Sequence, residues 1–155
     1  MSVTSSSNYL RFLSVWIGFV AIMALGNTMQ CFFDHSFLSS RLYTTQPERN
    51  VTGLAARLFG TWTLLAAVLR FACAVNIHNN TVYHLTFFSF FLALGHFVSE
   101  VYPYKTAELS IGVCAPLLVS SLSIIMMAVG YAFPRPKKET ERDEAAKLAR
   151  KAKFS

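Results

Sequence analysis

The sequence predicts an all-α membrane protein with four transmembrane helices and both termini in the cytosol. The 155-residue chain is 54% hydrophobic and only 14% charged, whereas an average soluble domain has about 25% charged residues. Its apolar residues are gathered in four stretches, each long enough to cross a hydrocarbon core of about 30 Å. Positive charge is concentrated outside these stretches, since eight of the 14 lysines and arginines lie in residues 134–155.

Composition also excludes several classes of protein. The basic pI of about 9.5 reflects the tail, and no basic face with interleaved aromatic residues is present, so we expect no nucleic-acid partner. The three cysteines (Cys31, Cys73 and Cys114) are scattered and odd in number. They therefore predict neither a disulfide framework nor a metal site, and no cofactor is expected.

The first expected span is 12–33, which carries no formal charge and is bracketed by Arg11 and Asp34. The serine-rich residues 1–8 before it are expected to be disordered. A cleaved signal peptide is the alternative, but it would need a shorter apolar core and a small-x-small cleavage site. The polar exit at 26–30 offers no good site, which favours a retained transmembrane helix.

The next two spans form a hairpin. Residues 34–53 are a turn-rich polar loop that cannot lie in lipid. Spans 57–77 and 82–101 then flank a polar turn, which is short enough to make them antiparallel neighbours. The second of them is rich in phenylalanine, which is typical of lipid or core packing and, as an alternative, of a ligand groove.

The fourth expected span, 109–133, completes a transmembrane domain of residues 9–133. Pro116 is expected to kink it, and small residues give it faces for close helix contact. These are Gly112, Ser120, Ser121 and Ser123. Residues 134–155 form the basic cytosolic tail.

Orientation follows from the distribution of lysine and arginine. The side with both termini collects nine of these residues and the other side four, so we predict cytosolic termini. Lys151 and Lys153 then match the dilysine signal by which coat proteins return membrane proteins to the endoplasmic reticulum. The sequon at Asn50 would face the lumen.

Four polar residues are expected near the lumenal ends of the spans. Arg57 and Glu100 lie about twenty residues before and after the hairpin turn, and His96 shares a helix face with Glu100. Asp34 ends the first span. One hypothesis is a cluster of all four, with Arg57 paired to Glu100, that locks the helices or binds a polar head group. The alternative is separate anchoring at the interface.

Arg70 lies nearer the cytosolic end, within reach of the surface. Snorkelling or a hydrogen bond between helices is one interpretation, and a ligand contact is the other. It belongs to a set of candidate helix-packing or partner contacts, which comprises Asn27, Gln30, Trp62 and Arg70.

A catalytic site is not indicated. The four histidines are too few and too scattered for a membrane di-iron enzyme. Neither H-E-x-x-H nor G-x-S-x-G is present. His96 and Glu100 could act as an acid-base pair, but no nucleophile or oxyanion donors accompany them. We therefore expect a protein that is not an enzyme.

Several motifs resemble the ergosterol biosynthetic protein 28 family, most closely its animal-like form, over residues 9–130. They are Gly26-Asn27-Thr28 with Gln30, Ala56-Arg57-x-Phe59-Gly60-x-Trp62-Thr63-Leu64-Leu65 with Arg70, Ala93-Leu94-Gly95-His96-Phe97-x-Ser99-Glu100, and Ala115-Pro116-Leu117.

This resemblance implies a non-enzymatic scaffold of the endoplasmic reticulum membrane. Such proteins tether the sterol C-4 demethylation enzymes: the C-4 methyl oxidase, the decarboxylating 3-dehydrogenase and the 3-keto reductase. Membrane lipid or sterol, coat proteins and a second copy of the chain are further partners to consider. Alternative functions are a factor that helps another membrane protein fold or leave the endoplasmic reticulum, and a sterol-binding membrane protein.

Overall fold

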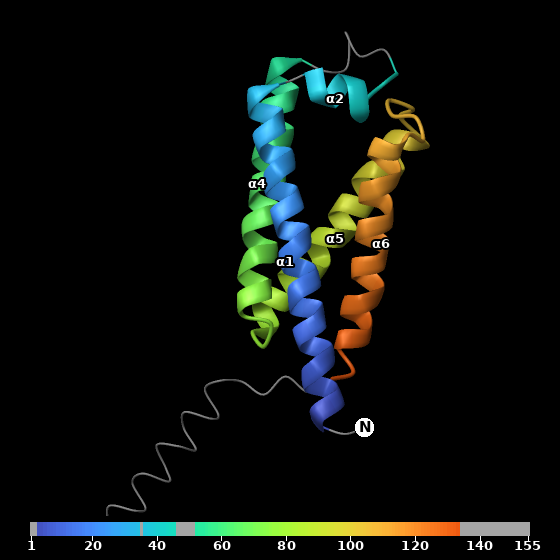
Figure 1. Cartoon of the computed structure of the whole chain (residues 1–155). Coiled ribbons are helices and arrows are strands. Elements are labelled where there is room, and N and C mark those ends of the chain that lie inside the picture. Colours follow the sequence, from blue (N-terminus) through green and yellow to red (C-terminus); the bar gives the residue numbers. More distant parts are fainter. Residues whose placement is uncertain (1–2, 35, 46–51, 134–155) are drawn as a thin grey trace, which may run out of the picture.

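Four long helices make up the body of the protein in this computed structural model (Figure 1). The structure describes residues 3–34, 36–45 and 52–133, with side chains from residue 7 onward except that of residue 37. The long helices are α1 (Val3–Phe33), α4 (Gly53–Val75), α5 (Asn80–Val101) and α6 (Ile111–Gly130), and the short α2 is Ser36–Arg41.

Each long helix is long and apolar enough to cross a membrane, and the described residues contain no strand. The all-α fold class with four membrane-spanning helices is therefore confirmed. The first residue of α1 and the last residue of α6 lie at the same end of the bundle (Figure 1), as an even number of spans requires. Which side of the membrane this end faces stays a prediction.

The ends of the helices are set by local polar groups. The side chain of Thr52 accepts a hydrogen bond from the Ala55 amide and begins α4. Asn79 does the same for α5 through the amides of Thr81 and Val82. At the N-terminus of the chain, α1 begins at Val3. The serine-rich residues for which the sequence predicted disorder are therefore part of this helix. The tail at 134–155 and the sequon at Asn50 lie outside the described residues.

Helices α1 and α4 pack against each other along their length through small residues. A Cβ added at Gly18 would lie 3.5 Å from the Cβ of Ala74, and one at Gly60 would lie 3.0 Å from the Cβ of Cys31. Lipid tails are as apolar as the helices, so burial alone does not hold membrane helices together. Close approach of the two backbones at small residues supplies the van der Waals contact that holds α1 and α4 together.

One end of the bundle, here called the closed end, is where all four long helices meet. Its core includes Leu13 and Ile17 of α1, Tyr83 and Phe90 of α5, and Met127 of α6. The Tyr83 hydroxyl donates to the Met127 carbonyl at 2.6 Å, and it crowds the place that a Cβ of Gly130 would occupy. The absence of a side chain at Gly130 therefore lets α5 and α6 approach.

The opposite end, here called the capped end, is covered by α2 (Figure 1). Leu38 of α2 and Leu42, which directly follows it, are buried in a second core with Phe59, Phe97 and Val113. The Ser110 hydroxyl donates to the Arg41 carbonyl at 3.2 Å, which ties α2 to the start of α6. At this end α2 thus occupies space between the long helices.

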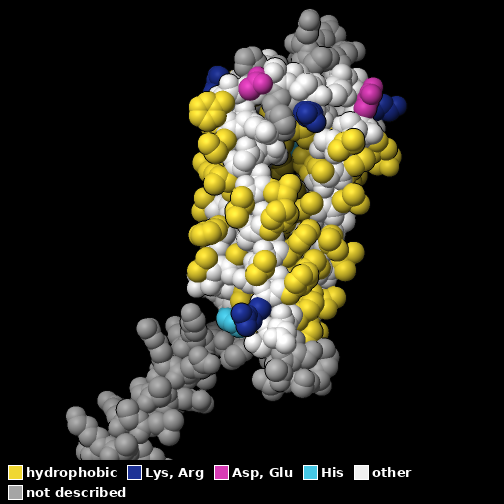
Figure 2. Space-filling view, viewed as in Figure 1, with side chains coloured by type: hydrophobic (Ala, Val, Ile, Leu, Met, Phe, Trp, Pro, Cys, Tyr) yellow, Lys and Arg dark blue, Asp and Glu magenta, His cyan; other side chains and the backbone are white. Residues whose placement is uncertain are grey.

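The outer surface between the two ends is mostly apolar. In Figure 2 hydrophobic side chains cover the middle of the visible face, and the charged side chains lie toward its two ends. Large exposed residues there include Phe12, Phe19, Leu65 and Ile125. This distribution matches a body that faces lipid at its middle and water at both ends.

Candidate functional site

A polar cluster lies at the capped end, where Tyr43 follows α2 and meets α5. The hydroxyl of Tyr43 and Nε2 of His96 are 2.7 Å apart. One turn further along α5, Nδ1 of His96 lies 3.9 Å from the Glu100 carboxylate. The Thr106 hydroxyl donates to that carboxylate. Four side chains thus form one chain of polar contacts, which we call the Tyr43–Thr106 cluster.

Aromatic rings surround the histidine of this cluster. The ring of Trp62 lies 5.0 Å from that of His96, with Phe97 at 5.2 Å and Phe59 at 6.2 Å between ring centroids. As a result the side chain of His96 is 29% exposed and that of Glu100 only 19%. Hydrogen bonds are stronger in such a low-dielectric environment, and they hold their partners in place.

Burial raises the pKa of Tyr43, and the charge of Glu100 and the neighbouring Cys31 thiol raise it further. The phenol therefore keeps its proton well into the alkaline range. A protonated Tyr43 can donate to Nε2 of His96, which leaves Nδ1 as the protonated nitrogen that faces Glu100. The cluster can orient a polar group at the membrane surface through its hydroxyl, imidazole and carboxylate groups.

The structure brings together two of the four residues predicted to cluster. His96 and Glu100 are joined, whereas Asp34 accepts from the amide and hydroxyl of Ser36 at 3.0 and 2.6 Å, at the start of α2. Arg57 is exposed on α4. Within the described residues no ion pair joins it to Glu100, so the pairing proposed from the sequence is not present.

Arg57 does not pair with Glu100 because of the direction in which its side chain leaves α4. Its depth is as predicted, because α4 begins and α5 ends at the capped end (Figure 1). Each residue turns an α-helix by about 100°, so Arg57 lies about 200° around α4 from the buried Phe59. Phe59 faces the Tyr43–Thr106 cluster, and Arg57 therefore faces away from it.

Sequence reasoning missed Tyr43 and Thr106, the two members of the cluster that lie outside the long helices. The segment 34–53 was interpreted as a polar loop, although its apolar residues Leu38 and Leu42 are four apart. That spacing is the signal of a helical turn with one buried face. In the structure both are buried, and the backbone bond from Tyr43 to the Leu38 carbonyl (2.8 Å) follows from that turn.

Arg70 points into the bundle. It is only 8% exposed, and its guanidinium carbon lies 4.4 Å from the ring centroid of Phe90 on α5. Its Nε is buried and has no hydrogen-bond partner in the described part of the chain. Arg70 therefore contacts a neighbouring helix and does not extend to the surface.

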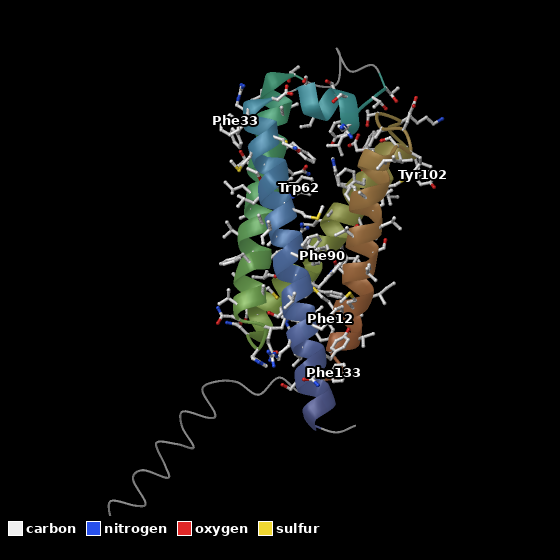
Figure 3. All side chains as sticks on the ribbon, in the orientation of Figure 1. Phe12, Phe33, Trp62, Phe90, Tyr102 and Phe133 are labelled. Carbon is white, nitrogen blue, oxygen red and sulfur yellow. The ribbon has the colours of Figure 1, made fainter. Side chains whose placement is uncertain are left out.

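A cavity of about 210 Å³ lies beside Arg70, between the four long helices and the end of α2. Two other candidate contacts, Asn27 and Trp62, line it, whereas Gln30 is exposed on α1. Figure 3 labels Trp62 and Phe90, which come from α4 and α5 and lie at different heights in the bundle. In the described residues no three His, Cys, Asp or Glu side chains form a group that could hold a metal ion.

Comparison of the sequence with known proteins identifies a family to which the chain is similar. The family model described as "Erg28 like protein" matches residues 13–125, which include all of α4 and α5 and most of α1 and α6. The "Ergosterol biosynthetic protein 28 homolog" of Homo sapiens is 53% identical over 127 residues, covering 82% of this chain and 90% of that protein. The mouse homolog is 51% identical over the same length.

More distant relatives carry the same name. The "Ergosterol biosynthetic protein 28" of Saccharomyces cerevisiae is 34% identical over 116 residues, covering 75% of this chain and 78% of that protein. No solved structure matches the chain significantly. The match of the family model to most of the chain, together with relatives from yeast to human, shows that this protein belongs to the Erg28 family.

Proposed function

We propose that this protein is a non-enzymatic scaffold of the endoplasmic reticulum membrane that tethers the sterol C-4 demethylation enzymes. The observation that supports this most is family membership, because the relatives are named for ergosterol biosynthesis and are matched over most of their length. Holding consecutive enzymes together raises their effective concentration for one another, so that an intermediate reaches the next enzyme before it diffuses away.

The outer faces of the bundle are suited to contact with partner helices. Gly95 lies on the exposed side of α5, and no atom is within 4 Å of the place where its Cβ would be. A partner helix can approach the backbone closely at such a glycine. Gly95 also lies beside His96, which orients toward the bundle interior. We propose this face of α5 as one contact for a partner enzyme.

Co-purification tests the proposal. The tagged full chain, extracted in mild detergent, should carry with it the C-4 methyl oxidase, the decarboxylating 3-dehydrogenase and the 3-keto reductase. Its loss should lead to accumulation of 4-methyl or 4-carboxy sterols. Unchanged sterols together with no co-purification would reject the scaffold.

A substitution on the outer face locates the contact. Gly95→Leu places a side chain where a partner backbone would lie, and its Cβ has no atom of its own bundle within 4 Å. We expect it to reduce recovery of one partner enzyme while thermal unfolding in detergent stays unchanged. Gly26→Leu, at an exposed glycine of α1 that also has no atom within 4 Å of the place for its Cβ, is a matched control on another helix and should keep partner recovery closer to wild type.

We also propose that the dilysine ending retains the scaffold in the endoplasmic reticulum. Lys151 and Lys153 lie outside the described residues, so this part of the proposal depends on the sequence alone. Replacing both by alanine should allow some of the protein to reach the Golgi, as followed by microscopy. Strict retention of the double variant would show that the spans or their partners hold it in place.

A further inference from the structure

The cavity inside the bundle is elongated and mostly apolar. Its walls come from all four long helices and include Val20 of α1, Phe59 of α4, and Phe97 of α5. Along α4 it extends from Phe59 to Arg70, which is about 16 Å at 1.5 Å per residue. Figure 2 shows the visible face hollowed just below the capped end. At about 210 Å³ the space can hold part of the apolar body of a lipid, with the remainder extending out through the hollow.

The two arginines that line this cavity differ in burial: Arg41 is exposed at the capped end, whereas Arg70 at the other end is buried without a charged partner among the described residues. Arg70 lines it, is 8% exposed, and has a buried Nε that lacks a hydrogen-bond acceptor. No carboxylate among the described residues forms an ion pair with it. A charge buried within a membrane is costly unless it is paired, and such residues commonly mark a functional site.

The contact with Phe90 compensates for only part of this cost. A cation above a ring face, here at 4.4 Å, gains electrostatic attraction from the ring but no hydrogen bonds. Guanidinium is planar and presents its N–H groups as a fork, which matches the two oxygens of a carboxylate. A carboxylate would both neutralise the charge and accept these hydrogen bonds.

We infer that this cavity binds an amphiphilic lipid, with a carboxylate paired to Arg70 and an apolar body between Val20, Phe59 and Phe97. A phosphodiester head group fits less well, because its polar substituents would have to lie against apolar walls. The shared chemistry is a single carboxylate on an elongated apolar body, and its source is either a fatty acid or a steroid acid. The inference is independent of the scaffold role.

Photolabelling of the full chain tests the inference. The purified protein, reconstituted in phosphatidylcholine nanodiscs, is irradiated with a fatty acid that carries a diazirine and an alkyne, or with a steroid acid modified in the same way. Labelling by at least one acid should be saturable and map by mass spectrometry to peptides that line the cavity. The acid that labels identifies the source. No saturable labelling by either would overturn the inference.

A matched ligand and matched variants test the role of the carboxylate. The corresponding alcohol probe should label at least about tenfold less, which corresponds to about 1.4 kcal/mol. Arg70→Gln should remove the preference for the acid. Arg57→Gln, on the same helix but exposed and away from the cavity, should keep it. Equal labelling by acid and alcohol, or Arg70→Gln behaving like Arg57→Gln, would overturn the inference.

A third variant addresses stability. Ala93 is half-buried and lines the cavity, so Ala93→Leu fills space while Arg70 stays in place. Saturable labelling should fall for this variant, even if Arg70→Gln does not fold. Wild-type labelling of a folded Ala93→Leu protein would place the lipid elsewhere and overturn the inference.

Discussion

The long helices are held together differently at the two ends of the bundle. At the closed end, side chains of one helix donate to backbone or side-chain oxygens of another. The Tyr9 hydroxyl donates to the Met126 carbonyl at 2.7 Å, Ser14 to the Ala74 carbonyl at 2.6 Å, and the Trp16 indole to Ser123 at 3.0 Å. These bonds join α1 to both α4 and α6.

At the capped end, α1 and α6 are separated and α2 lies across the top of the bundle (Figure 1). Tyr43 and Thr106, which lie outside the long helices, make polar bonds there, and the direct bond between long helices in this half, between Thr28 and Thr63 at 2.9 Å, joins α1 to α4 and not to α6. The cavity extends from this end down to Arg70. The difference shows that one bundle can be closed by direct bonds between helices at one end and kept open by an inserted segment at the other.

The largest effect on stability is expected from adding a side chain at the contact between α2 and α6. In Gly112→Ala the new methyl group would overlap the backbone carbonyl of Arg41, which cannot move without shifting α2. Overpacking of this kind costs about 1–3 kcal/mol. We expect unfolding in detergent at a lower denaturant concentration, and changed fluorescence of Trp62 as the capped end rearranges.

The control for this substitution is Gly26→Ala. Gly26 is exposed on α1, and no atom lies within 4 Å of the place for its Cβ. Alanine there should be neutral or stabilise the helix by up to about 1 kcal/mol. If the two alanine variants unfold alike, α2 is not held against α6 as the structure describes.

A smaller effect is expected at the closed end. Tyr83→Phe removes the hydrogen bond to the Met127 carbonyl from a fully buried position. Hydrogen bonds between membrane helices contribute about 0.6 kcal/mol on average and up to about 1.7, so we expect a loss of about 1 kcal/mol. Tyr102→Phe, at an exposed position beyond α5, should unfold like the wild type. Unchanged stability of Tyr83→Phe would mean that this hydrogen bond does not contribute to holding α5 against α6.

The sequence was sufficient for the features that depend on position along the membrane normal. Runs of apolar residues predicted the four helices, and small residues on the fourth were expected to allow close contact. In the structure Ser123 bonds to Trp16 and Gly112 meets the Arg41 backbone. The four-residue spacing of His96 and Glu100 also predicted their contact.

Features that depend on direction around a helix, or on a short segment, could not be predicted in the same way. Arg57 has the expected depth but faces away from Glu100, because depth says nothing about which neighbour a side chain meets. Tyr43 reaches His96 only because α2 folds back over the bundle. The cavity depends on the separation of α1 and α6, which is a property of the packed bundle and of no single segment.

Double-mutant cycles at the capped end test which residue interacts with the His96–Glu100 pair, Tyr43 or Arg57. Tyr43→Phe and His96→Phe should be coupled by about 0.6 kcal/mol, because they share one hydrogen bond. Arg57→Ala and Glu100→Ala should have independent effects on stability. Coupling in the second pair with additivity in the first would show that Arg57, and not Tyr43, completes the cluster.

A further change in stability, expected only above pH 10, also originates in the Tyr43–Thr106 cluster. Burial and the Glu100 charge raise the pKa of Tyr43 above its ordinary value of 10.0. As pH rises past 10 the unfolded chain loses this proton first, so the unfolded state binds fewer protons and stability falls until the folded-state pKa is reached. Below pH 10 the contribution of Tyr43 is complete and constant.

Alkaline titration followed by tyrosinate absorbance measures this shift. The chain has six tyrosines, and the difference between wild type and Tyr43→Phe isolates the contribution of one. We expect the missing component to titrate above pH 10, and the fall in stability beyond that pH to be smaller in Tyr43→Phe. A difference spectrum that titrates at the ordinary value would place Tyr43 in water and would show that the capped end is open above His96.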